Sequence, residues 1–117
     1  MTSTIRRLRS MLFAPAVRPD FVARLGERGA DVVVIDCEDA TPADAKATAR
    51  VTCRDLVPAL AQTCVVTVRI NPPTTEWFAA DVRDGLCAEV AAVVVPKVES
   101  LDGLATVCRA LEDAGLR

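Results

Sequence analysis

The sequence predicts an α/β fold in which parallel strands alternate with helices. Short apolar runs rich in Val, Ile and Leu start roughly every 22 to 33 residues. Helix start and stop signals separate these runs. Three of the runs end in charged or amide side chains, as buried strands do when they deliver functional groups to one edge of a parallel sheet.

The composition indicates one globular domain. The chain has 117 residues, of which 51% are hydrophobic and 26% are charged, so we expect a buried core and no extended disorder. Aromatic residues make up only 3%, so aliphatic side chains must build that core. A net charge of −2 gives no basis for a nucleic-acid surface, and we expect no nucleic acid among the partners.

The cysteines and the absence of histidine narrow the chemistry. The five cysteines are odd in number and widely spaced, so we expect reduced thiols in place of a disulfide framework or zinc site. Without histidine, acid–base chemistry must use carboxylates, lysine or metal-bound water. The first residues lack the apolar core of a signal peptide, and no apolar run could span a bilayer. We therefore expect a cytoplasmic protein that does not bind membranes.

The first two predicted strands frame a helix. Residues 9–15 form the first strand, which ends at a proline. Pro19 suits the first position of the helix that follows, and Gly29 suits the position just past its end. The second strand covers residues 31–37, an unbroken apolar run that ends among acids.

The second predicted helix starts at about residue 43. Apolar side chains recur at helical spacing from Ala49 to Leu60. Pro58 lacks a backbone N–H, so it predicts that the regular helix ends near Val57 or is kinked there.

The remaining elements repeat the strand–helix alternation. Residues 64–71 form the third strand, which a proline pair ends, and a short helix covers residues 78–86. The fourth strand covers residues 90–98. Ser100 is a suitable N-cap for a fourth helix, which Gly115 ends. Two architectures fit four such units, either a small open sheet or half of a (β/α)8 barrel, since a full barrel needs about 250 residues.

Polar side chains follow the second, third and fourth strands. The carboxyl ends of parallel strands lie at one edge of a sheet, so we expect these groups to meet there. Alternation places Asp36 with Glu38 on one face, provided that the strand extends that far. This mixture suits a small anionic substrate and a hard divalent cation. The full set is Asp36, Glu38, Asp39, Arg69, Asn71, Lys97 and Glu99.

Most of these side chains also have an ordinary structural explanation. The acids can cap the next helix or pair with the nearby cations. Lys97 can extend to solvent, and Arg18 can be a loop charge. Arg69 is harder to explain in this way, because it ends an apolar strand. Arg69 is therefore the first candidate for a functional role.

Five motifs, in this order, resemble a known family. They resemble the citrate lyase β-subunit-like branch of the HpcH/HpaI aldolases, which contains citryl-, malyl- and citramalyl-CoA lyases. The resemblance implies a (β/α)8 TIM barrel in which residues 1–117 are the N-terminal half, covering four β-α units. The motifs are RSMLFAP at 9–15 with Arg18-Pro19, IDCEDA at 35–40, DAKATAR at 44–50, VRINP at 68–72 and VPKVES at 95–100.

The resemblance implies a magnesium-dependent carbon–carbon lyase. Such enzymes cleave a 3-hydroxyacyl-CoA into an acyl-CoA and a 2-oxo acid. By motif position Arg69 binds the substrate, and Glu38 lies near the metal and its waters, as Asp36 also can. The direct metal ligands of the family follow the fifth and sixth strands, so none is assigned here. The implied catalytic residues are Arg69 and Glu38, and the implied substrate-binding residues are Arg69, Asn71, Lys97 and Arg18, the last toward the CoA.

Three functional hypotheses remain open. The chain is a fragment or truncated form of such a lyase, inactive by itself; it derives from an aldolase that acts on free 2-oxo acids; or it is a non-catalytic half barrel that assembles with a full-length relative. An isolated half barrel exposes two sheet edges and an apolar inner face. We therefore expect pairing with another chain, and the resemblance implies a homo-oligomer, which is a trimer in relatives.

Overall fold

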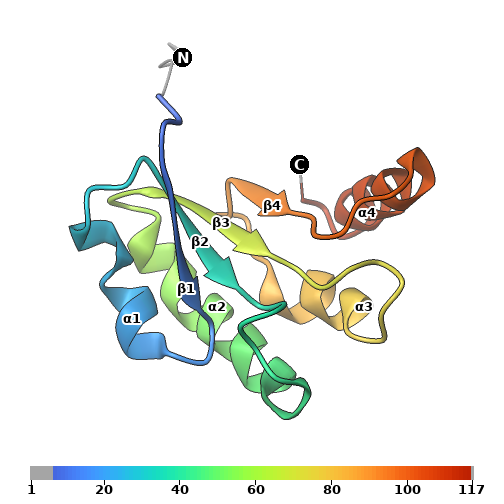
Figure 1. The fold of residues 1–117 in the computed structure, drawn as a ribbon, viewed down its shortest axis with the longest axis horizontal. Coiled ribbons are helices and arrows are strands. Elements are labelled where there is room, and N and C mark those ends of the chain that lie inside the picture. The colour runs from blue at the N-terminus through green and yellow to red at the C-terminus, as the bar shows by residue number, and fades with distance from the viewer. Residues whose placement is uncertain (1–6, 117) are drawn as a thin grey trace.

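Four parallel strands form the centre of the structure, a computed structural model that describes residues 7–116 (Figure 1). The strands lie side by side in the order in which they follow one another in the chain. Valine and isoleucine dominate them, as suits strands in a parallel sheet. They are β1 (Met11–Pro15), β2 (Val32–Asp36), β3 (Val65–Arg69) and β4 (Ala92–Val94).

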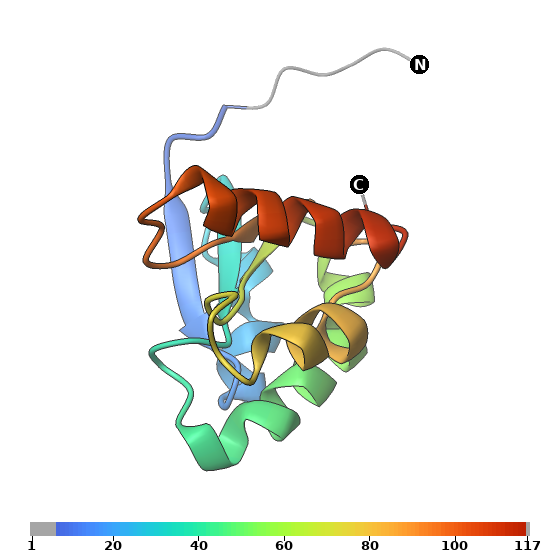
Figure 2. The ribbon, with the colours of Figure 1, turned by 90° about the vertical axis from the view of Figure 1, so that its right-hand side faces the viewer.

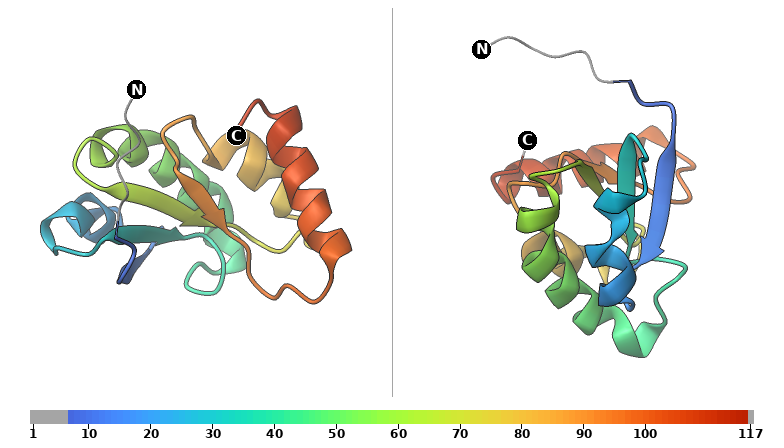
Figure 3. Two further views of the ribbon diagram at one scale, coloured as in Figure 1. Left: turned by 90° about the horizontal axis from the view of Figure 1, so that it is seen from above. Right: turned by 90° about the vertical axis from the view of Figure 1, so that its left-hand side faces the viewer.

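Helices cover one face of this sheet. In Figures 2 and 3, α1, α2 and α3 lie on that face, and α4 lies beside α3, past the β4 edge. None of the helices within the described residues is long and apolar enough to cross a membrane. Their bounds are Pro19–Ala23 for α1, Lys46–Leu60 for α2, Phe78–Ala80 for α3, which continues as a π-helical turn over Asp81–Gly85, and Leu101–Asp113 for α4.

The core lies between the sheet and the helices. Alternate side chains of β2 and β3, such as Val33, Ile35 and Val68, point into it and are buried. The opposite face of the sheet carries no helix among the described residues, and Met11 and Phe13 of β1 are exposed there. The sheet therefore has one covered and one open face.

The last residues of the four strands stand in one row. Pro15 pairs with Asp36, Asp36 with Arg69, and Arg69 with Val94. This register brings the carboxyl ends of all four strands to the same edge. The polar segments that follow the strands consequently start from neighbouring positions.

Two helices end at other positions than the sequence predicted. Helix α1 stops at Ala23, and a separate 3-10 turn over Leu25–Glu27 follows before Gly29, so that Leu25 reaches the core. Helix α2 continues to Leu60 although Pro58 lies inside it. Pro58 stands in the last turn, so only one helical hydrogen bond is lost, and the buried Leu60 stabilises the extension.

The fourth strand is shorter than predicted. Only Ala92–Val94 pairs with β3, whereas the apolar run suggested residues 90–98. Pro96 cannot donate to a neighbouring strand, and Lys97 has a positive φ of 53°. Both features end the extended conformation soon after Val94.

Candidate active site

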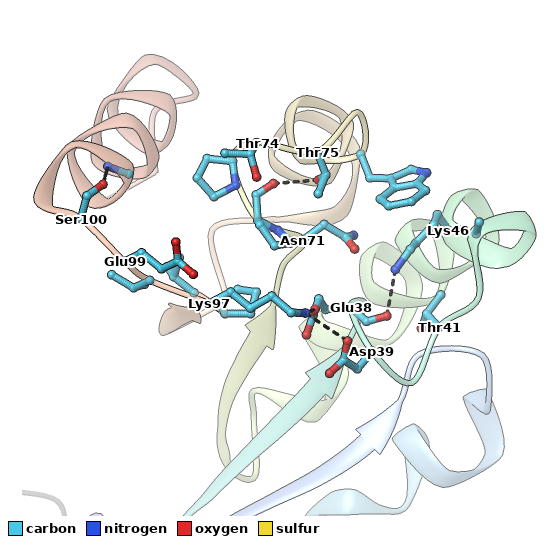
Figure 4. Close-up of a pocket in the computed structure, with 18 residues that line it drawn as sticks. Glu38, Asp39, Thr41, Lys46, Asn71, Thr74, Thr75, Lys97, Glu99 and Ser100 are labelled. Carbon is cyan, nitrogen blue, oxygen red and sulfur yellow. Dashed lines mark hydrogen bonds and ion pairs between the residues drawn. The ribbon is translucent and has the colours of Figure 1, made fainter.

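A pocket of about 700 Å³ opens at the carboxyl edge of the sheet (Figure 4). The segments that follow β2, β3 and β4 line it, together with the first residues of α2 and α4. Five of the predicted polar side chains contribute to its wall, namely Glu38, Asp39, Asn71, Lys97 and Glu99. Asp36 and Arg69 do not line it, but they lie directly behind Glu38, since Arg69 Nε is 3.6 Å from Glu38 Oε1.

Asp36 and Arg69 form a bidentate ion pair between adjacent strand ends. Arg69 Nε donates to Asp36 Oδ1 at 3.0 Å, and Nη2 donates to Oδ2 at 2.6 Å. The backbone N–H groups of Glu38 and Ala40 also donate to the Asp36 carboxylate. Burial favours the neutral acid, but these donors outweigh it and hold the pKa of Asp36 below its ordinary value. Asp36 therefore serves to orient Arg69.

One side of the Arg69 guanidinium remains available. Its carbon lies 5.0 Å from the centre of the Phe13 ring, and none of residues 7–116 accepts a hydrogen bond from Nη1. Hydrogen bonding to Asp36 raises the pKa of Arg69, so the group is a permanent cation. An arginine held on one edge and open on another is suited to bind a carboxylate.

Glu38 lies between two cations. It is buried, and Lys97 Nζ donates to its Oε2 while Arg69 approaches its Oε1. Lys97 also reaches Asp39 Oδ1 at 3.3 Å, and both carboxylates raise the pKa of Lys97. The structure thus brings together Asp36, Glu38, Asp39, Arg69 and Lys97, although β2 ends before Glu38 and the expected strand alternation does not extend to it.

Asn71 has its amide nitrogen committed within the fold. Nδ2 donates to Cys37 O at 3.1 Å and to Asp81 Oδ2 at 2.6 Å, and the Asn71 N–H donates to the same carboxylate. Arg50 Nε donates to the other Asp81 oxygen at 2.9 Å. Asn71 lines the pocket, but its amide chiefly ties the end of β3 to β2 and to the turn after α3.

Arg18 lies apart from this group. It follows β1, where it pairs with Asp20 at 2.9 Å and stacks over the Phe21 ring at 3.9 Å. No contact among the described residues links it to Glu38 or Arg69. Glu99 lines the pocket, and within residues 7–116 its carboxylate has no ion-pair partner.

Sequence reasoning assigned no role to three residues that support the site. Lys46 binds the carbonyl oxygens of Cys37 and Glu38, and Arg50 and Asp81 form a partly buried ion pair beside Asn71. Lys46 and Arg50 stand in the motif at 44–50, four positions apart on one helix face. That spacing was a usable signal, because both are charged residues on the helix that packs against the sheet.

The carboxylates do not by themselves fit a direct magnesium site. Asp36 is bound by Arg69, and Glu38 and Asp39 are bound by Lys97, so the acids carry little uncompensated charge. Within residues 7–116, no group of three or more acidic or cysteine side chains is arranged to hold a metal ion. A magnesium ion near Glu38 would need oxygen ligands from elsewhere.

Comparison with known proteins identifies a matching family model and similar curated proteins. The family model described as HpcH/HpaI aldolase/citrate lyase matches residues 9–115. The citrate lyase subunit beta-like protein of Deinococcus radiodurans is 42% identical over 115 residues, covering 93% of this chain and 40% of the relative. The (3S)-malyl-CoA thioesterase of Cereibacter sphaeroides is 30% identical over 117 residues, 92% of this chain and 38% of that protein. The chain thus spans about two fifths of these curated relatives.

Solved structures agree in fold. The citrate lyase beta subunit of Mycobacterium tuberculosis, complexed with oxaloacetate and magnesium, has a TM-score of 0.68 and 34% identity over 83% of this chain and 42% of that chain. CitE of the same organism, in complex with magnesium, acetoacetate and coenzyme A, has a TM-score of 0.64 and 35% identity over 86% and 35%. The predicted α/β fold of the TIM-barrel type is confirmed for the part of the barrel that this chain covers.

Proposed function

The chain belongs to the HpcH/HpaI aldolase/citrate lyase family, a family of lyases, and on that premise we propose that it is part of a magnesium-dependent carbon–carbon lyase. The proposed reaction cleaves a 3-hydroxyacyl-CoA of the citryl-, malyl- or citramalyl-CoA type into an acyl-CoA and a 2-oxo acid. The ligands of the related structures support this choice, because they include oxaloacetate, coenzyme A and magnesium.

The observation that carries the proposal is the half-open guanidinium of Arg69. Asp36 fixes two of its nitrogens, and the remaining N–H groups are free to bind the carboxylate of a 2-oxo acid in a defined orientation. A fixed positive charge also stabilises negative charge that develops on the substrate during carbon–carbon cleavage. In the proposal Arg69 binds the oxo acid, and Glu38 acts as the second catalytic residue by orienting water molecules near the metal.

The other site residues have supporting roles in the proposal. Lys97 pairs with Glu38 and can reach a substrate anion from the open side of the pocket. Asn71 contributes to the pocket wall, and Arg18 contacts the CoA portion. Magnesium would supply Lewis-acid chemistry, with direct ligands outside residues 1–117 and with Glu38 or Asp36 reaching it only through water.

We further propose that residues 1–117 supply the N-terminal half of a barrel and have little lyase activity alone. Remaining strands would come from further sequence or from another chain, and the assembly would be oligomeric. The open sheet face with exposed Met11 and Phe13 supports such a partner. The five cysteines are free thiols, which suits the proposed cytoplasmic location.

A coupled assay for release of a 2-oxo acid tests the proposal. Citryl-, malyl- and citramalyl-CoA are offered with magnesium to the chain alone. They are also offered to a chimera in which residues 9–115 replace the matching segment of a relative that turns over one of these substrates. We expect turnover only in the chimera, and a loss of about 100-fold or more in kcat/KM for Arg69→Ala.

Two outcomes would contradict this proposal. A folded chimera with no activity on any of the three thioesters would contradict the proposed reaction. Turnover by the 117-residue chain alone would contradict the proposal that activity requires residues from outside this chain.

An aldolase that acts on free 2-oxo acids is a second candidate. Arg18 pairs with Asp20 and lies apart from the other site residues. This separation favours the second candidate, because the geometry does not link the proposed CoA-binding residue to the rest of the site. An Arg18→Ala chimera that keeps full turnover of a free hydroxy acid, and that CoA does not affect, would select this candidate.

A non-catalytic half barrel that assembles with a full-length relative is the third candidate. The mutual neutralisation of the acids and cations favours it, since it leaves no complete metal site within residues 7–116. Stable association of the chain with a full-length relative, without any change in turnover, would select it.

A further inference from the structure

We propose that Lys46 is a positioning residue that holds Glu38 at the pocket. This inference rests on the proposed role of Glu38. Lys46 is the first residue of α2, and its Nζ donates to the carbonyl oxygen of Cys37 at 2.9 Å and to that of Glu38 at 2.8 Å (Figure 4). The ammonium therefore binds the two peptide groups that flank the Glu38 α-carbon, the one before it through Cys37 O and the one after it through Glu38 O.

The burial of Lys46 indicates a specific role. Its exposure is only 6%, and among the described residues no carboxylate lies within ion-pair distance of Nζ. A buried ammonium is costly unless other groups compensate for its lost hydration. Here the compensation comes from the two carbonyl oxygens and from the face of Trp77, whose ring centre is 5.0 Å from Nζ. The Lys46 ammonium group thus interacts mainly with the main chain that follows β2.

The same main-chain segment is held from a second direction. The carbonyl oxygen of Cys37 also accepts a hydrogen bond from Asn71 Nδ2 at 3.1 Å, which links it to the end of β3. Fixing the carbonyls of Cys37 and Glu38 fixes the direction in which the Glu38 side chain leaves the backbone. Glu38 is then aimed at Lys97 and Arg69 before any ligand binds, as preorganised sites require.

Arg54 provides a matched control. It lies on the same helix, and its Nη1 also donates to a backbone carbonyl oxygen, that of Arg83, at 3.1 Å. This contact is exposed, and Arg54 does not line the pocket. Arg54→Met thus removes a cation-to-carbonyl contact of α2 without touching the segment that carries Glu38.

Amide hydrogen exchange of the chain, followed by NMR, tests the positioning role without requiring activity. Lys46→Met should raise the exchange rates of Glu38, Ala40 and Thr41, whose N–H groups are hydrogen-bonded within this segment, by about tenfold or more. Lys46→Arg should restore them to within about threefold of the parent chain, and Arg54→Met should leave them unchanged. If Lys46→Met does not fold, Lys46→Gln replaces it.

Kinetics in the active chimera give a second readout. Lys46→Met should lower kcat while KM for the thioester stays within about twofold, because Arg69 and not Glu38 binds the substrate. Unchanged exchange at Glu38, Ala40 and Thr41 in a folded variant would overturn the positioning role. Faster exchange with unchanged kcat would instead count against the catalytic role proposed for Glu38, so the two failures are distinguishable.

Discussion

The two sides of the candidate site are built differently. On the β2–β3 side, Asp36 and Asn71 at the strand ends and Asp81 in the turn after α3 are buried, and each makes two or more hydrogen bonds. At the end of β4, Lys97 has a side chain that is 60% exposed, and it follows a strand of only three residues. Lys97 also has a left-handed backbone conformation, which is uncommon for a residue with a side chain.

This difference separates fixed groups from adjustable ones. A buried carboxylate with several donors cannot move without leaving polar atoms unpaired, so Asp36 and Asp81 hold their neighbours in place. The exposed Lys97 becomes hydrated when it leaves Glu38, and Arg69 Nε remains 3.6 Å from that buried carboxylate, which limits the cost of the movement. The β2–β3 side is therefore suited to orient a substrate, and the β4 side to admit it.

The largest expected effect is that of Asp81→Ala. This change leaves Arg50 Nε, which is partly buried, and the Asn71 backbone N–H without their acceptor, and it removes one of the two acceptors of Asn71 Nδ2. Breaking a buried pair in this way costs about 3–5 kcal/mol in the free energy of unfolding. Urea denaturation measures it. Asp84→Ala is the control, because Asp84 lies in the same turn but pairs with Arg83 at the surface. Equal midpoints for the two variants would contradict the division into fixed and adjustable sides.

A smaller loss is expected for Asp36→Asn. Its neutral amide cannot replace the charged bidentate contact with Arg69, which should cost about 1.5–3 kcal/mol at neutral pH. The pKa of Asp36 is lowered in the folded chain, so the contribution is complete above the unfolded pKa of about 3.9. It is lost as the pH falls through the lower folded value. The difference in denaturation midpoint between parent and variant should therefore be full at pH 7 and should shrink as the pH is lowered below about 3.9.

The smallest effect is expected for Lys97→Met. Because the Lys97 side chain is largely exposed, we expect the urea midpoint at pH 7 to shift less than for either aspartate variant. The pKa of Lys97 is raised by Glu38 and Asp39, so any contribution is present below the unfolded pKa of about 10.4. It disappears as the pH rises through the folded value. A loss of stability as large as that of Asp36→Asn would show that the β4 side is also fixed.

The sequence predicted the positions of the strands and the meeting of Asp36, Glu38 and Arg69. Both follow from local patterns, since an apolar run that ends in polar residues marks a strand end, and parallel strands share an edge. The hydrogen-bond partner of each side chain could not be predicted from these local patterns. Whether Asn71 faces a ligand or Asp81 depends on how the turn after α3 packs against β3, and periodicity carries no information about that contact.

The β4 segment shows the same limit. Its apolar run is long enough for nine strand residues, but pairing requires N–H groups at the correct register, and Pro96 has none. The helix predicted for residues 78–86 likewise forms only as one α turn and one π turn. Short elements of this kind are determined by their tertiary neighbours more than by their own propensities.

The order of the strands in the sheet has a consequence for the way in which the protein is made. Because β1 to β4 lie in chain order, each strand pairs with the one that was synthesised before it. A ribosome releases residues from the N-terminus onward, so the partner of every new strand is already available when that strand emerges. No strand has to wait for a distant segment before it is covered on at least one edge. This topology lets the sheet grow stepwise during translation, one strand and one helix at a time.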